Sequence, residues 1–166
     1  LGQTDQELQG IITTYGYPPI WTRPNHFASL IHIILEQQVS LASAKAAFIK
    51  LEEYVGDINA TTILKLSDEE LRNCYFSRQK TIYARELAKA IKNGSLSLEE
   101  LETKDDDVVR EELKKVKGIG DWTVDIYLLF VLQRCDVFPT GDLAMIKSLK
   151  QIKNLPSSTN KEKLLE

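Results

Sequence analysis

Asp142 is an acidic residue whose surroundings suit chemistry at a charged centre. It ends a loop that contains Pro139 and Gly141, and an apolar segment of helical period follows directly. An aspartate at a helix start is most simply a cap for the first backbone N–H groups. An ionised carboxylate held in such a place can also stabilise a cation that develops during a reaction. The sequence leaves both interpretations open, a helix cap and a catalytic carboxylate.

Two glycines separated by one residue, Gly118 and Gly120, lie between an amphipathic segment and a strongly apolar one. Such a pair allows a tight turn and close approach of the backbone to a partner. The helix start that follows offers N–H groups and a positive dipole end to an anion such as a phosphate. Lys117 and the hydroxyl of Thr123 would add donors. Many similar turns merely join two helices, so the pattern alone leaves that interpretation open as well.

The strings VKGIGDWTV (116–124) and VFPTGDLAMIK (137–147) together resemble the helix-hairpin-helix DNA glycosylases. The spacing from Gly120 to Asp142 matches that family, and the second string resembles its alkyl-base branch, which includes AlkA and the yeast Mag enzymes. The resemblance spans about Pro18 to Lys150. It implies that Asp142 is the catalytic residue. It also implies that Lys117, Gly118, Gly120 and Thr123 hold a DNA phosphate beside a flipped nucleotide.

The resemblance implies hydrolysis of an N-glycosidic bond in base excision repair. As the base departs, positive charge develops on the deoxyribose, and a fixed carboxylate stabilises it and can orient water. Alkylated purines of the 3-methyladenine and 7-methylguanine class already carry positive charge, so they leave without a strong general acid. One aspartate, Asp142, therefore suffices for this chemistry.

Trp122 occupies the position at which bifunctional members of the family carry a lysine. Indole cannot form a Schiff base, so we expect no lyase activity and an abasic site as product. Its ring could stack on a flipped, electron-poor base, or it could fill the core beside the turn. Relatives have a tyrosine where this chain has Ile126. We include the adjacent Tyr127 among the base-pocket residues, although it lies about 100° further round the helix.

Further site residues follow from the resemblance. Gln38, at the end of an apolar helix, falls where relatives insert a side chain into the duplex to fill the gap left by the flipped base. Glu36 replaces a glycine of the relatives and either lines the base pocket or points at solvent. Trp21 is expected to border the pocket. Tyr75 also stands where relatives have glycine.

No redox cofactor or catalytic metal is expected. The resemblance allows a sodium or potassium ion on the hairpin, held by the backbone carbonyls of Lys114, Val116 and Ile119. The two cysteines, Cys74 and Cys135, form no CxxC pair, so neither a zinc site nor the iron–sulfur cluster of some family members is predicted.

The chain has 166 residues, a net charge of −3 and 27% charged residues. This charge argues against a protein that grips nucleic acid by charge alone, so the site for double-stranded DNA with damaged bases must be local. No apolar run has the length of a membrane span, and the first residues lack a signal-peptide pattern. We expect a monomer that works away from membranes, either in the cytoplasm of a bacterium, as an activity associated with the nucleoid, or elsewhere inside the cell.

Nearly all periodic segments have the helical period, which predicts an all-α fold. Helices are expected over 27–35, 41–54, 78–92 and 121–133, and once or twice within 98–115. Gly56 is expected to be the C-cap of the helix over 41–54, and the capping-box pattern Ser67-Asp-Glu-Glu70 predicts a further short helix from there onward. The resemblance implies two lobes with a cleft between them. A six-helix barrel spans 25–135 and contains the hairpin at 113–124, and 1–24 with 136–166 form the second lobe. Relatives continue into a further helix, so we expect the second lobe to be incomplete here.

Two alternatives remain open at this stage. One is a non-catalytic helix-hairpin-helix module that only binds DNA or a protein partner, which the acidic balance and the short C-terminus leave open. The other is a glycosylase for oxidised or mismatched bases, because the pocket residues depart from those of the alkyl-base branch.

Overall fold

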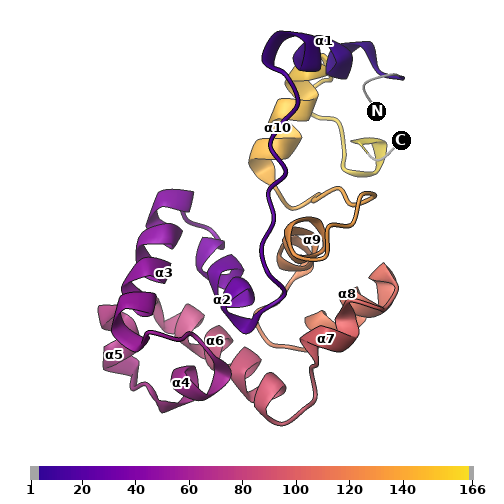
Figure 1. Cartoon of the computed structure of the whole chain (residues 1–166). Helices are drawn as coiled ribbons and strands as arrows, with labels where there is room; N and C mark the ends of the chain where they lie inside the picture. Colours follow the sequence, from indigo (N-terminus) through magenta and orange to yellow (C-terminus); the bar gives the residue numbers. More distant parts are fainter. Residues whose placement is uncertain (1–3, 165–166) are drawn as a thin grey trace. The chain divides into compact units, whose positions relative to one another are not determined.

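The computed structural model describes residues 4–164, and within that range every regular element is helical, which confirms the all-α prediction (Figure 1). Two compact units form. The first contains residues up to Thr22 and those from Phe138 onward, and the second spans Arg23–Val137. The boundaries differ by two residues from those expected from the sequence. The helices are α1 (Gln6–Tyr15), α2 (Phe27–Glu36), α3 (Leu41–Val55), α4 (Ala60–Lys65), α5 (Asp68–Asn73), α6 (Arg78–Lys92), α7 (Leu98–Leu101), α8 (Asp106–Lys114), α9 (Asp121–Phe130) and α10 (Leu143–Ile152), followed by a short 3₁₀ turn at Glu162–Leu164.

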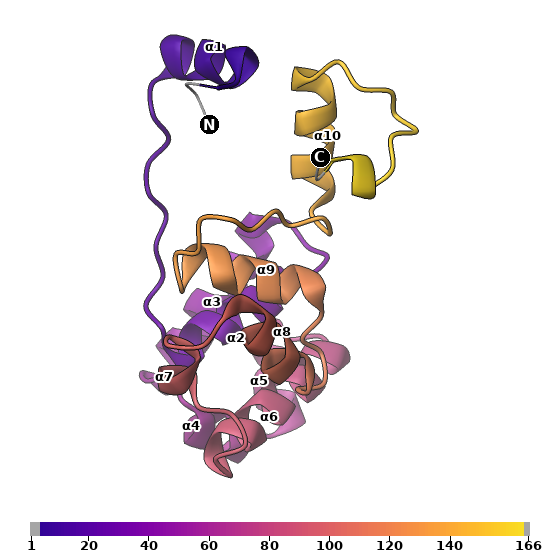
Figure 2. The same cartoon turned by 90° about the vertical axis from the view of Figure 1, so that its right-hand side faces the viewer.

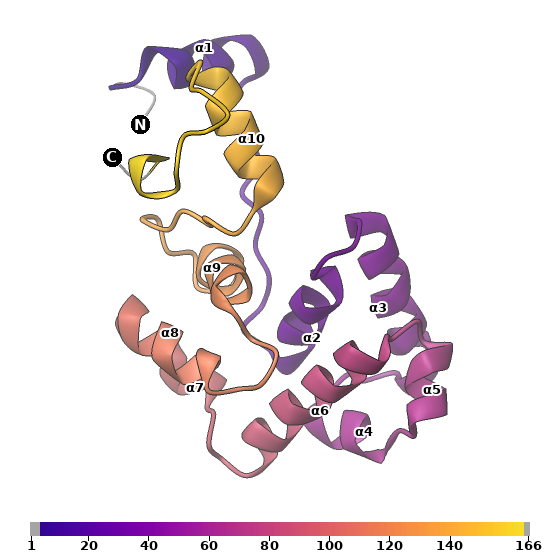
Figure 3. The ribbon, with the colours of Figure 1, turned by 180° about the vertical axis from the view of Figure 1, so that it is seen from behind.

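Helix α2 forms the centre of the second unit. Its apolar side chains, including Leu30, Ile31 and Ile34, are fully buried, as the stripe of helical period predicts. It packs against α3, α6 and α9, and α8 packs along α9 (Figures 2 and 3). These contacts place the end of α2 beside the start of α9, where the glycine turn lies.

Helix α9 is buried along most of its length, but it is shorter than expected. It ends at Phe130, whereas the apolar pattern predicts a helix to Gln133. The N–H of Leu132 bonds to the carbonyl of Tyr127, and Gln133 has φ of 55°, so the chain turns away there. Inside the helix, Asp125 is buried and pairs with Arg110 of α8 at 2.6 Å. Burial raises the pKa of Asp125, and Arg110 opposes that rise.

The expected capping box at the start of α5 is confirmed. The hydroxyl of Ser67 accepts from the N–H of Glu70 at 3.2 Å, and Glu70 Oε2 accepts from the N–H of Ser67 at 2.7 Å. This backbone bond, with the Tyr54 hydroxyl, lowers the pKa of Glu70 to about 2. Gly56 ends α3 with φ of 73°, as its position in the sequence predicts.

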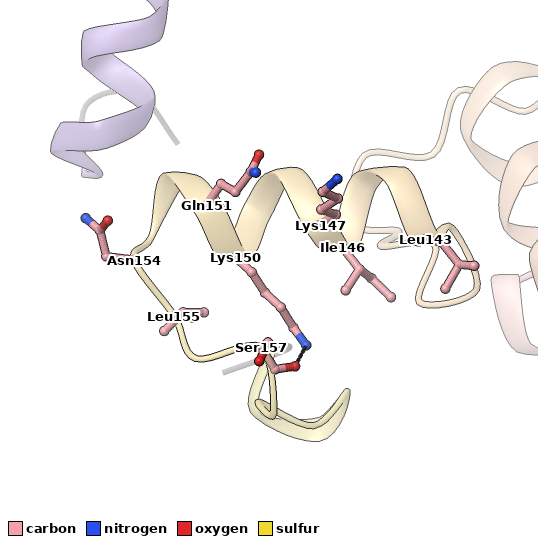
Figure 4. A pocket seen from close by; sticks show the side chains of 8 residues that line it. All are labelled: Leu143, Ile146, Lys147, Lys150, Gln151, Asn154, Leu155 and Ser157. Carbon is pink, nitrogen blue, oxygen red and sulfur yellow. Dashed lines mark hydrogen bonds between the residues drawn. The ribbon is translucent and has the colours of Figure 1, made fainter.

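The first unit contains α1, α10 and the segment that follows α10. Lys153 at the end of α10 pairs with Asp5 and with Glu7, 3.1 Å away, at the start of α1. An open hollow lies between α10 and the following segment, and Figure 4 shows Lys150 Nζ donating to the Ser157 carbonyl across it at 2.8 Å. None of the residues predicted for the site lines this hollow.

None of the helices in the described part combines the length and apolar character needed to cross a bilayer. Within the same residues, no group of three or more His, Cys, Asp or Glu side chains is arranged to hold a metal ion. Cys74 is buried and Cys135 is exposed, each as a free thiol.

Tyr75, in the turn between α5 and α6, has φ of 64° and an exposed ring. This left-handed backbone explains why glycine suits the position, because a side chain there costs about 1 kcal/mol. We expect Tyr75→Gly to be more stable than Tyr75→Ala by about 1 kcal/mol, since the alanine variant loses the ring but keeps the strain. Urea unfolding of both variants measures the difference, and equal stabilities would contradict a strained turn.

Candidate functional site

The turn between α8 and α9 depends on two glycines that do different things. Gly118 has φ of 97°, and a Cβ built on it would overlap the ring of Tyr83 on α6. Gly120 has φ of −108° and open space around its missing Cβ. Gly118 therefore allows both a left-handed backbone and a close approach to α6, whereas Gly120 serves as the N-cap of α9.

The start of α9 has the features expected of an anion site. Gly120 is exposed and, as a glycine, gives no side-chain cap to the first N–H groups of α9. Lys117 is exposed on the same turn, and Lys114 pairs with Asp121 at 2.6 Å. Helix N–H groups and a nearby ammonium group together favour an anion. Lys117, Gly118 and Gly120 thus lie together, and their contact with DNA stays a prediction.

Gln37 holds this turn against the end of α2, and sequence reasoning missed it. Its Nε2 donates to the Gly118 carbonyl and to Thr123 Oγ1, both at 2.9 Å. Thr123 is only 2% exposed, so the prediction that its hydroxyl contacts DNA is wrong: that hydroxyl is buried and bonds to Gln37. The available signal was a polar residue at the end of an apolar helix, since a buried amide must find partners.

Gln38 is exposed and has φ of 57°, an unusual backbone conformation for a residue other than glycine. Its neighbour Val39 is 45% exposed and Leu41 is 72% exposed. The turn between α2 and α3 therefore presents Gln38 to solvent, next to apolar side chains. Insertion of Gln38 into a duplex is compatible with this position and stays a prediction.

Glu36 does not point at solvent, so that alternative is wrong. It is 8% exposed, and its two oxygens accept from Arg23 at 2.7 and 3.0 Å. Arg23 lies two residues after Trp21 in the sequence.

Trp21 belongs to the first unit and is 62% exposed, and its role beside a base stays a prediction.

Tyr127 is fully buried, and its hydroxyl donates to Asn25 Oδ1 at 2.6 Å. Burial raises its pKa. A side chain without exposed surface cannot contact a base, so the prediction that Tyr127 lines the pocket is wrong. Trp122 is partly buried and packs against the core of the second unit, as the core-filling interpretation expects. Part of the Trp122 side chain remains exposed, so its stacking on a base stays a prediction.

Asp142 is the N-cap of α10. Its Oδ1 accepts from the N–H groups of Ala144 and Met145, both at 3.0 Å, and the residue is partly exposed. The capping interpretation is confirmed. The same two bonds fix the carboxylate and stabilise its negative charge, which is what a catalytic carboxylate also requires.

The carbonyls predicted to hold a monovalent cation lie on the hairpin. The carbonyl of Val116 accepts from the N–H of Ile119 at 3.1 Å, and Lys114 is the last residue of α8. A carbonyl oxygen has two lone pairs, so this bond leaves Val116 able to act as a ligand. The backbone at these positions is thus chemically suited to an ion, which stays a prediction.

Replacing Gly118 by alanine tests the close approach to Tyr83. We expect Gly118→Ala to lose about 2–4 kcal/mol of stability, because it adds both backbone strain and an overlap with the ring. Gly120→Ala is the matched control. It should lose less than about 1 kcal/mol, since its Cβ meets open space and only the N-cap preference changes. Chemical unfolding measures both, and similar losses would refute the distinct roles.

Comparison with known proteins adds independent support. Residues 31–166 match the model of the HhH-GPD superfamily base excision DNA repair protein family. The chain is 30% identical over 144 residues to DNA-3-methyladenine glycosylase 1 of Schizosaccharomyces pombe, covering 84% of this chain and 63% of that protein. It is 27% identical over 166 residues to the putative DNA-3-methyladenine glycosylase YfjP of Bacillus subtilis, covering 95% of this chain and 58% of that protein. It therefore spans about three fifths of the length of these two relatives.

The fold also matches a solved structure, the 3-methyladenine DNA glycosylase Mag1 of Schizosaccharomyces pombe in complex with abasic DNA. The TM-score is 0.89 at 27% sequence identity, covering 99% of this chain and 84% of that chain. With the glycine turn, the glycine N-cap of α9 and the helix-capping Asp142 all present, the family match over residues 31–166 is decisive. This chain belongs to the HhH-GPD superfamily of base excision DNA repair proteins.

Proposed function

We propose that this chain is a DNA glycosylase that hydrolyses the N-glycosidic bond of alkylated bases, of the 3-methyladenine and 7-methylguanine class, in double-stranded DNA. The observation that carries the proposal is the fixed carboxylate of Asp142 at the start of α10, in a chain whose glycine turn leads into a helix with a glycine N-cap. The relatives named as DNA-3-methyladenine glycosylases support the substrate class.

Asp142 would act on the sugar. The bond from C1′ to the base nitrogen breaks, its electron pair leaves with the base, and the alkylated purine becomes neutral. The carboxylate stabilises the cationic deoxyribose, and a water molecule adds to C1′ and gives a proton to the Asp142 carboxylate, which later releases it to solvent. Because Oδ1 accepts from two helix N–H groups, the side chain is oriented before the substrate arrives.

The hairpin would hold the DNA. The N–H groups at the start of α9 and the ammonium of Lys117 suit a phosphate, with Gly118 and Gly120 leaving the backbone accessible. A sodium or potassium ion on the carbonyls of Lys114, Val116 and Ile119 would supply further positive charge for the phosphate when bound. No redox cofactor enters this chemistry.

The remaining roles concern the base and the duplex. Gln38 would fill the gap in the stack, Trp122 would stack on the flipped base, and Trp21 would border the base pocket. We propose that the protein acts as a monomer on damaged double-stranded DNA, in the cytoplasm or elsewhere inside the cell.

The first test replaces the proposed catalytic charge. Asn caps helices as well as Asp, so Asp142→Asn should leave folding intact while removing the anion. We expect base release from duplexes with 3-methyladenine or 7-methylguanine to fall at least about 100-fold, with DNA binding retained. Asp105→Asn, at the exposed N-cap of α8, is the control for losing an acidic charge at a helix start.

Undiminished release by Asp142→Asn would disprove the mechanism. Binding without release in the unmodified protein would instead indicate a non-catalytic DNA-binding module. Release of hypoxanthine or uracil in preference to the alkylated bases would assign a different glycosylase activity.

A second test concerns strand cleavage. Because Trp122 provides no amine, the product strand should stay intact until hot alkali cleaves it at the abasic site. Borohydride added during the reaction should trap no covalent protein–DNA adduct. Spontaneous nicking with a trapped adduct would show lyase activity from another amine and contradict this part of the proposal.

A further inference from the structure

The last two residues of α2 and its C-cap residue Gln37 are each held by a different part of the second unit. The carbonyl of Leu35 accepts from Lys80 Nζ of α6 at 2.5 Å. Glu36 pairs with Arg23, and the Gln37 amide bonds to the glycine turn and α9. The exposed Gln38 follows directly. Three independent contacts therefore determine where the turn between α2 and α3 begins.

The Arg23–Glu36 pair is the charged member of this set. Two guanidinium nitrogens bond to the two carboxylate oxygens, a paired geometry that fixes orientation as well as distance. The side chain of Glu36 is 6% exposed and that of Arg23 is 25% exposed. Arg23 is itself anchored, since its backbone N–H donates to the Phe130 carbonyl at 2.7 Å and its guanidinium lies 6.0 Å from the centre of the Phe130 ring. The pair therefore connects the end of α2 to the end of α9.

One other titratable group lies near the carboxylate. His32 Nε2 is 3.7 Å from Glu36 Oε1, and the imidazole stacks on Phe48 of α3 with ring centres 4.4 Å apart. Burial lowers the pKa of His32. Arg23 is the cation that bonds to both carboxylate oxygens of Glu36, and its loss would leave that buried carboxylate without this partner.

We propose that Arg23 and Glu36 are positioning residues for Gln38, which they hold ready to enter the DNA duplex. The inference rests on the proposed function, because it assigns the pair a role in engaging DNA. A side chain that replaces a base in the stack must keep its place against the closing duplex. Ordering a mobile turn during binding costs conformational entropy. A turn that is already ordered in the free protein avoids this cost. The left-handed backbone of Gln38 needs such support, because it is intrinsically unfavourable.

A double-mutant cycle tests this role. Arg23→Ala with Glu36→Ala removes the whole pair and leaves no unpaired charge. Binding is measured to a duplex with a stable abasic analogue, at a temperature where circular dichroism shows every variant folded. Removing the pair should weaken binding about tenfold when Gln38 is present, and cause no further loss in a Gln38→Ala background.

The Arg110–Asp125 pair provides the matched control. Its carboxylate is as buried as that of Glu36, with 5% of the side chain exposed against 6%, but the pair joins α8 to α9 and does not include a residue of α2. Arg110→Ala with Asp125→Ala should change binding by the same factor in both Gln38 backgrounds. The change in DNA binding on removing the control pair could instead depend on Gln38 as strongly as the change on removing the Arg23–Glu36 pair. The coupling to Gln38 would then reflect a general loss of stability, and the inference would fail.

Different results would contradict the positioning role of Arg23 and Glu36 and the proposed glycosylase function. Equal losses on removing the Arg23–Glu36 pair in both backgrounds would make it purely structural, whatever the base-release assay shows. Unchanged binding by Gln38→Ala alone would also overturn the inference, while base release still decides the glycosylase proposal. If the pair-less variant does not fold, Glu36→Gln, which keeps the shape but not the charge, enters the same cycle with the same criterion.

Discussion

The close contact between Gly118 and the Tyr83 ring determines how the hairpin sits on the second unit. Because Gly118 has no side chain, the turn can lie against α6 while its backbone takes a left-handed conformation. Its carbonyl then meets the Gln37 amide at the end of α2. The start of α9, the end of α2 and the first turns of α6 consequently share one small region. The proposed DNA-binding features depend on that closeness.

Buried polar contacts give this region its order. The Gln37 amide bonds to the partly buried Gly118 carbonyl and to the buried Thr123 hydroxyl, Lys80 bonds to the last turn of α2, and Arg23 pairs with Glu36. Each bond is individually modest, but a buried polar group without a partner is costly, so the arrangement is tightly specified. A site built from a few ordered groups, rather than from a large basic surface, is compatible with the net charge of −3. Its affinity for DNA would come from directed helix N–H groups and a few cations rather than from a large basic surface.

Local patterns predicted much of the fold. The capping box at Ser67 and Glu70, the C-cap at Gly56 and the bounds of α6 agree with the structure, because caps and periodicity act over a few residues. The predicted end of α9 was wrong, because the apolar residues 131 and 132 pack against the core although they lie beyond the end of the helix. The family match confirms the resemblance carried by the glycine turn and Asp142.

The sequence by itself determined the helical class, the glycine turn and the helix start at Asp142, because each depends on residue type and near neighbours. Only the tertiary structure decided which side chains remain exposed. It buried Thr123 and Tyr127, which had been assigned to the site, and it gave Glu36 a distant partner in Arg23. Burial and pairing depend on elements that are far apart in the chain. The spacing of residues within one segment does not show which distant segments will pack together. The contacts of α2 with α6, α9 and Arg23 are of that kind.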